Sequence, residues 1–178
     1  MHTGTHLLSK QVFSDFDEAP LYMVEGVNYK IKAHLTDFCH DKMSKWIGKD
    51  IHVVSPMRHP ALVMESFRRR DRKLTQKEKP FGLNVLPGQD FESQWENLRY
   101  YDSQCDINYI HIDDFKNRDG QVKVLGEKIG CDLSCDWPIG AKESGATHGT
   151  HDLKITDELI NKVPDWIMDF YNEIARRY

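Results

Sequence analysis

An arginine and a serine, eight residues apart, stand where an expected strand turns into an expected helix. The segment "IHVVSPMRHPALVMESF" runs through an apolar stretch to Arg58, then to Pro60, and then to Ser66. A guanidinium binds a phosphate through a charged fork, and a serine hydroxyl adds a further hydrogen bond. A helix N-terminus beside them also favours an anion. The spacing therefore predicts a phosphate-binding segment, and the alternative is that Arg58 closes the strand with a salt bridge.

A glycine turn near the N-terminus offers a second set of phosphate donors. The stretch "HTGTHLL" places a small hydroxyl-rich turn directly before apolar residues at helical spacing. Backbone N–H groups in such a turn wrap around an anion, and the hydroxyls of Thr3 and Thr5 add donors. The turn lacks the full G-x-x-x-x-G-K-[ST] pattern of a P-loop. A plain helix cap therefore remains the alternative interpretation.

The elements that must position these residues alternate between strand and helix. Apolar periodicity and the placement of proline and glycine predict three strands and five helices. We also expect surface loops at 73–90 and 134–153, where prolines and glycines interrupt the chain. This alternation predicts a parallel sheet covered by helices. The expected strands are 28–35, 50–56 and 107–112, and the expected helices are 4–16, 60–70, 91–105, 120–133 (ending near Gly130) and 163–178.

The composition is that of a soluble globular protein. The chain has 178 residues, 39% hydrophobic and 29% charged, which suits one domain spanning 1–178. A net charge of −4 argues against a general nucleic-acid partner, and the lack of a long apolar span argues against a membrane. Four irregularly spaced cysteines indicate neither a zinc site nor a disulfide framework, and we expect no metal. Since the N-terminus also lacks a charged region followed by an apolar signal core, we expect a cytoplasmic location.

Four segments, taken in order along the chain, resemble the sulfotransferase family. "TGTHLL" is similar to the family's 5′-phosphosulfate loop, and "YKIKAHLTDF" resembles its K-T-H-L-P strand. "IHVVSPMRHPALVMESF" resembles its 3′-phosphate-binding segment, in which a serine follows an arginine by eight residues. "IHIDDFKNRDGQVKVLGEKIGCDL" is similar to a later strand and the helix after it. The resemblance covers roughly 2–16, 28–67 and 107–133.

The resemblance implies an α/β three-layer sandwich with a mostly parallel central sheet, the P-loop nucleoside triphosphate hydrolase-like fold of sulfotransferases. It also implies the donor 3′-phosphoadenosine 5′-phosphosulfate, with 3′,5′-adenosine bisphosphate as product. Arg58 and Ser66 would hold the 3′-phosphate of this donor. The residues expected at the 5′-phosphate are Thr3, Gly4, Thr5 and His6.

The same resemblance assigns catalytic roles to two residues on one strand face. His34 would take the proton of a hydroxyl on a small-molecule or carbohydrate acceptor, because its reference pKa of about 6.5 suits a general base near neutral pH. Lys32, two residues away, would steady the sulfuryl group or the bridging oxygen. Glu25, or a carboxylate such as Asp37, is a second candidate base, because some carbohydrate sulfotransferases have a similar layout with a glutamate.

The chain departs from the family pattern at its start. His2 stands where the family usually has a lysine or arginine, and the apolar strand that should lead into the glycine turn is missing. Two interpretations stay open: a sequence truncated at its first strand, or a sheet that lacks this strand. In a homo-oligomer, a neighbouring chain could supply it. Two alternative functions stay open: a small-molecule or nucleotide kinase of P-loop architecture, and a degenerate nucleotide-binding fold without catalysis.

Overall fold

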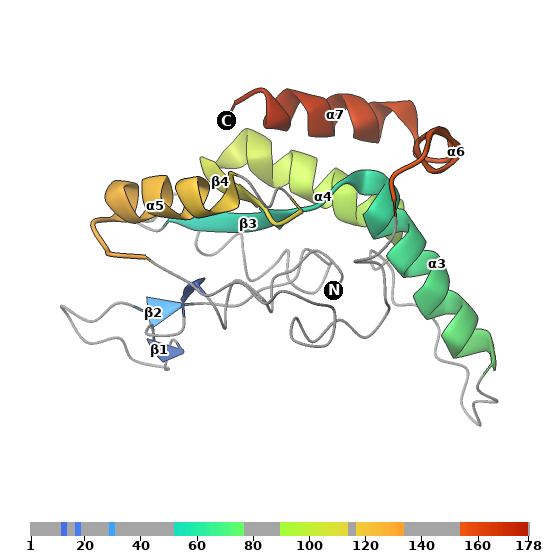
Figure 1. The fold of residues 1–178 in the computed structure, drawn as a ribbon, viewed down its shortest axis with the longest axis horizontal. Helices are drawn as coiled ribbons and strands as arrows, with labels where there is room; N and C mark the ends of the chain where they lie inside the picture. The colour runs from blue at the N-terminus through green and yellow to red at the C-terminus, as the bar shows by residue number, and fades with distance from the viewer. Residues whose placement is uncertain are drawn as a thin grey trace.

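The computed structural model describes residues 12–13, 17–18, 29–30, 52–76, 90–113, 117–133 and 154–177 of the chain. These residues form short parallel strands and helices of up to 17 residues, an α/β arrangement (Figure 1). The elements, in chain order, are β1 Asp17–Glu18, β2 Tyr29–Lys30, β3 Val53–Met57, α3 Pro60–Gln76, α4 Phe91–Gln104, β4 Ile107–His111, α5 Arg118–Ile129, α6 Asp157–Ile160 and α7 Asp165–Ala175.

Strands β3 and β4 pair in parallel, so their carboxyl ends lie at the same edge. The register runs from Val53 opposite Ile107 to Met57 opposite His111. Beyond the last pair, Ile112 N–H donates to the Met57 carbonyl at 3.0 Å, which carries the pairing one residue further. Helices α3 and α4 connect the two strands, as a parallel pair requires. Strands β1 and β2 form a second, two-residue parallel pair.

Strand β4 is buried on both faces, because consecutive side chains of a strand point to opposite sides. Ile107 and Tyr109 join one apolar cluster together with residues of α4 and α7. Ile110 joins a second cluster with Val122 and Leu125 of α5. Figure 1 shows α4 and α7 on the same side of the strand pair. The parallel pair thus lies between two apolar layers, each supplied by helices.

The helix boundaries follow from local signals in the sequence. Asp90 caps α4, since its carboxylate accepts from Ser93 N–H at 2.9 Å. Gly130 ends α5 in the left-handed conformation at φ 72°, where glycine has no steric cost. The α7 sequence places Ile167, Phe170 and Ile174 on one buried face, at the spacing of an amphipathic helix.

Most of the expected elements within the described residues are confirmed. Strands β3 and β4 and helices α4 and α7 lie within three residues of their expected bounds, α5 ends next to the expected Gly130, and β2 lies inside the expected strand at 28–35. The loop expected from residue 73 is wrong at its start, because α3 continues to Gln76 through good helix formers. Strand β1 and helix α6 were not expected. No described helix combines the length and the apolar character that crossing a membrane requires.

Candidate functional site

The junction between β3 and α3 is built from three residues that follow the strand directly. Arg58 and His59 follow Met57, the last residue of β3. Pro60 is the first residue of α3, where its fixed φ and its missing N–H have no energetic cost. The His59 imidazole Nδ1 accepts a hydrogen bond from Ala61 N–H at 3.3 Å. The His59 carbonyl accepts from Leu62 N–H at 3.0 Å. His59 therefore caps α3 with both its side chain and its backbone.

Asp113, just beyond β4, ties this junction to the neighbouring strand. Its two carboxylate oxygens share a hydrogen bond from Arg58 Nε, at 3.1 Å for Oδ1 and 3.3 Å for Oδ2. Oδ2 also accepts a hydrogen bond from the His59 backbone N–H at 3.2 Å. The Arg58 side chain is 4% exposed and the Asp113 side chain 27%. A buried guanidinium needs such a partner, because removing a charge from water is costly. The carboxyl ends of the two strands are thus joined by a charged pair.

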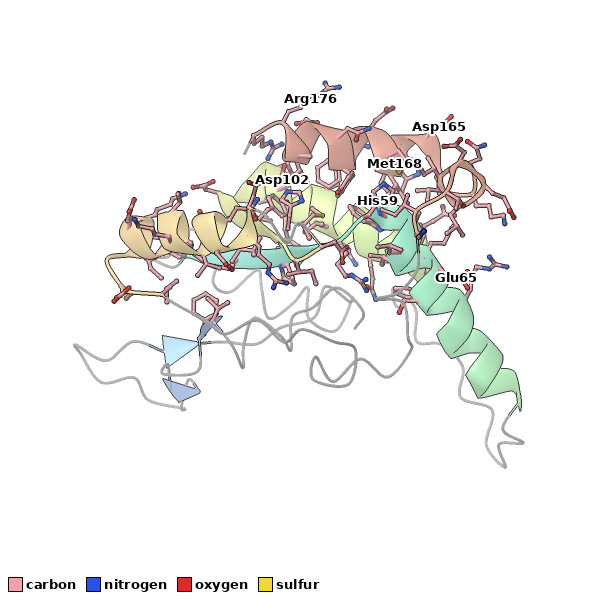
Figure 2. The ribbon with its side chains drawn as sticks, viewed as in Figure 1. His59, Glu65, Asp102, Asp165, Met168 and Arg176 are labelled. Carbon is pink, nitrogen blue, oxygen red and sulfur yellow. The ribbon has the colours of Figure 1, made fainter. Side chains whose placement is uncertain are left out.

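Tyr171 of α7 covers the same edge of the strand pair. Its ring lies edge-on to His59 with 5.2 Å between ring centroids, and edge-on to His111 at 6.0 Å. Figure 2 shows His59 where α3 begins, on the side of the molecule that faces α7. The rim of the β3–β4 pair therefore carries two imidazoles, a guanidinium, a carboxylate and a phenol.

Burial lowers the pKa of the His59 imidazole below its usual value of about 6.5, and the Asp113 carboxylate opposes this by favouring the charged ring. A lowered pKa favours the neutral imidazole. The hydrogen bond from Ala61 N–H also indicates the neutral form, since Nδ1 accepts only when it carries no proton. His59 is accordingly a neutral cap at neutral pH.

Ser66 lies in the second turn of α3 and is buried, at 2% exposure. It is six residues beyond Pro60, which corresponds to about 9 Å along the helix axis. Within the part of the chain that the structure describes, its hydroxyl makes no hydrogen bond. Ser66 and Arg58 thus belong to one strand–helix unit and are both withdrawn from solvent.

The structure tests the expected site residues unevenly. Arg58 and Ser66 are described, and Arg58 forms the salt bridge that the sequence left open as its alternative role. The expected base His34 and its neighbour Lys32 lie outside the described residues, as do the two other candidate bases. The glycine-turn residues lie outside them too: Thr3, Gly4, Thr5 and His6. Among the residues that the structure does cover, no cluster of three or more histidine, cysteine or acidic side chains is suited to a metal ion.

Two contributors to this edge were missed by reasoning on the sequence. The sequence left a salt bridge of Arg58 open but did not identify Asp113 as its partner. A signal was present, since Arg58 and Asp113 each follow a buried strand and parallel strands end at one edge. The local sequence does not indicate His59 as a cap, because histidine is not among the preferred helix caps.

Comparisons of the chain with protein-family models, with curated proteins and with solved structures give no match.

Proposed function

We propose that the chain is a sulfotransferase, which moves a sulfuryl group from 3′-phosphoadenosine 5′-phosphosulfate to a hydroxyl acceptor. The observation that supports this best is the position of Arg58 and Ser66 on a single strand–helix unit at the carboxyl end of a parallel strand pair. In parallel α/β sheets, ligands bind beyond the carboxyl ends of the strands. The order of the four resembling segments along the chain adds to this support.

The donors at this edge fit a phosphate in type. Arg58 supplies a permanent positive charge, and Ser66 supplies a hydroxyl that makes no hydrogen bond among the described residues. The Asp113 carboxylate on Arg58 Nε fixes the guanidinium but would repel a phosphate placed close to it. In our proposal the phosphate therefore approaches Arg58 from its terminal nitrogens, with Asp113 behind the side chain.

The transfer step follows from the resemblance and uses residues outside the described ranges. The acceptor oxygen forms a bond to sulfur while the bond from sulfur to the bridging phosphate oxygen breaks. The acceptor proton passes to His34, and 3′,5′-adenosine bisphosphate departs with the electron pair of the broken bond. Lys32 would stabilise the charge that develops on the bridging oxygen. The carboxylates Glu25 and Asp37 remain alternative bases in this proposal.

The proposal is tested by titrating 3′,5′-adenosine bisphosphate into the parent chain and three variants in a calorimeter. Ser66→Ala removes one hydroxyl at little cost in packing, and Arg58→Ala removes the guanidinium. We expect each to weaken binding at least tenfold, or about 1.4 kcal/mol, since hydrogen bonds to charged groups are worth about 1.5–3 kcal/mol. Arg68→Ala is the matched control, because Arg68 lies on the same helix with a 43% exposed side chain paired to Glu65.

Binding and turnover are then separated with a panel of alcohols, phenols and sugars as acceptors. Transfer of labelled sulfate that disappears in His34→Ala supports the enzyme as proposed. Tight binding of the bisphosphate without transfer to any acceptor would instead support a non-catalytic nucleotide-binding domain. Binding of Mg²⁺ and ATP with no affinity for the bisphosphate would support the kinase alternative, and this result would sink the sulfuryl-transfer proposal.

A further inference from the structure

A hollow of about 440 Å³ lies between α4 and α7. Four residues of α4 line it, at the spacing that brings side chains onto one helix face: Glu96, Arg99, Tyr100 and Ser103. Trp166 of α7 forms the opposing wall. The core residues of α4 (Trp95, Leu98 and Tyr101) lie on its other face. The hollow therefore contains no buried member of either apolar cluster and none of the residues placed at the β3–α3 junction.

Two aromatic rings shape the hollow, and both are held in place. Tyr100 is 46% exposed, which is high for an aromatic residue, and its ring lies edge-on to the buried Tyr101 at 5.3 Å. Trp166 is partly buried and packs against the apolar cluster beneath α7. Each ring thus presents a fixed surface to solvent, without the loss of side-chain freedom that a mobile residue would suffer on binding.

The charged groups of the hollow are available for a ligand. Glu96 and Arg99 are exposed, and neither has an ion-pair or side-chain hydrogen-bond partner within the described residues. The Trp166 indole N–H likewise has no such partner there. Carboxylate oxygens accept hydrogen bonds, whereas the guanidinium and the indole donate them. The hollow therefore presents donors and acceptors of hydrogen bonds beside apolar ring surfaces, with a net charge of zero.

We infer that this hollow binds an uncharged saccharide. A pyranose ring has C–H groups that pack on an aromatic ring and hydroxyls that both donate and accept, which matches both kinds of surface. The Glu96 carboxylate would repel a free phosphate or another anion, and the Arg99 guanidinium would repel a cation. A purely apolar ligand would bury both charges without partners, which is unfavourable. The size also suits a short oligosaccharide, because it falls within the range of about 300–1,000 Å³ for small-molecule sites.

The inference is tested by nuclear magnetic resonance on the full chain, using the indole N–H signal of Trp166, which Trp166→Phe identifies by its loss. The probes are cellotriose, maltotriose and the trisaccharide of N-acetylglucosamine, each added up to about 20 mM, well above a Kd on the order of 1 mM. We expect at least one probe to shift the Trp166 signal with saturation. Tyr100→Ala should weaken that binding at least tenfold, and Glu96→Gln should weaken it severalfold.

Glu92→Gln is the matched control, since Glu92 is an exposed acid one turn earlier on α4 and does not line the hollow. It should leave saccharide binding unchanged. The inference is overturned if none of the three probes moves the Trp166 signal, or if Tyr100→Ala binds as the parent does. 3′,5′-Adenosine bisphosphate is also titrated into Tyr100→Ala and Glu96→Gln, so that loss of saccharide binding is distinguishable from failure of the proposed function.

Discussion

Removing the Asp113 carboxylate is expected to destabilise the fold more than its partial exposure suggests. Asp113→Ala leaves the Arg58 guanidinium, only 4% exposed, without the contacts at 3.1 and 3.3 Å, and it leaves the His59 N–H without its acceptor. Breaking one side of a buried ion pair costs about 3–5 kcal/mol. Asp113 itself is 27% exposed, so water enters and relieves part of this cost. We expect a loss of about 2–4 kcal/mol in the free energy of unfolding.

The measurement is urea unfolding followed by circular dichroism, with thermal unfolding as a second readout. For a chain of this size, a loss of 3 kcal/mol corresponds to a fall of roughly 6–12 °C in Tm. The control is Asp106→Ala, which removes a carboxylate paired with Lys128 where the two side chains are 78% and 43% exposed. That variant should lose no more than about 1 kcal/mol. If the free energies of unfolding of Asp113→Ala and Asp106→Ala differ by less than about 1 kcal/mol, the Arg58–Asp113 pair does not stabilise the junction as argued.

A double-mutant cycle isolates the pair from other effects of the substitution. Arg58→Met removes the charge while keeping an unbranched apolar stem, so the double variant with Asp113→Ala contains no uncompensated guanidinium. The double variant should therefore lose less stability than the sum of the two single variants, with a coupling of about 1–3 kcal/mol. Simple additivity would mean that each residue acts through other contacts.

Three further predictions concern helices α3 and α5. His59→Asn keeps a hydrogen-bond acceptor at the α3 cap but removes the titrating imidazole. Burial lowers the pKa of His59 in the folded state. The contribution of His59 to stability is therefore present in full above about pH 6.5 and falls as the pH drops through the lowered pKa. Urea midpoints at pH 7, 6 and 5 should decline more steeply for the parent than for His59→Asn, and parallel profiles would contradict the cap. In α5, Gly120→Ala should raise the free energy of unfolding by about 0.5–1 kcal/mol, since a Cβ there meets nothing within 4 Å. Gly126→Ala should lower it by about 1–3 kcal/mol, because the Cβ would lie 2.6 Å from the Cys131 backbone oxygen, and thermal unfolding of the two variants gives the opposite signs directly.

The sequence predicts elements where the local pattern and the tertiary structure agree. The helices α4 and α7 carry apolar residues at the period of a helix, and each is buried on the side the pattern indicates. Strand β4, which the sequence indicates as a buried strand, is buried along its whole length. The four-residue helix α6 has too few residues to show a period, although Thr156 caps it by accepting from Leu159 N–H at 3.4 Å. The end of α3 was misplaced because polar residues were interpreted as a loop, whereas arginine, lysine and glutamine are good helix formers.

Contacts across the sheet are harder to predict, because they depend on register. Arg58 and Asp113 are 55 positions apart, and they meet only because Met57 lies opposite His111. A shift of the pairing by one residue would turn every side chain of β4 to the opposite face. Periodicity gives the faces of each strand but not the partner of each residue, so the sequence indicated Arg58 as a site residue without indicating what holds it.

The contact with Asp113 also determines which measurement can distinguish a binding role of Arg58 from a structural one. Loss of stability in Arg58→Ala is expected under both roles, since either way the partly buried Asp113 carboxylate loses its partner. A ligand that binds only the folded chain adds RT ln(1 + [L]/Kd), about 2.7 kcal/mol at a hundred times Kd. If Arg58 holds a phosphate, 3′,5′-adenosine bisphosphate should stabilise the parent by this amount and Arg58→Ala by far less at the same concentration. If Arg58 serves only the junction, the bisphosphate should raise the stability of both chains equally or of neither, whatever the difference between them without ligand.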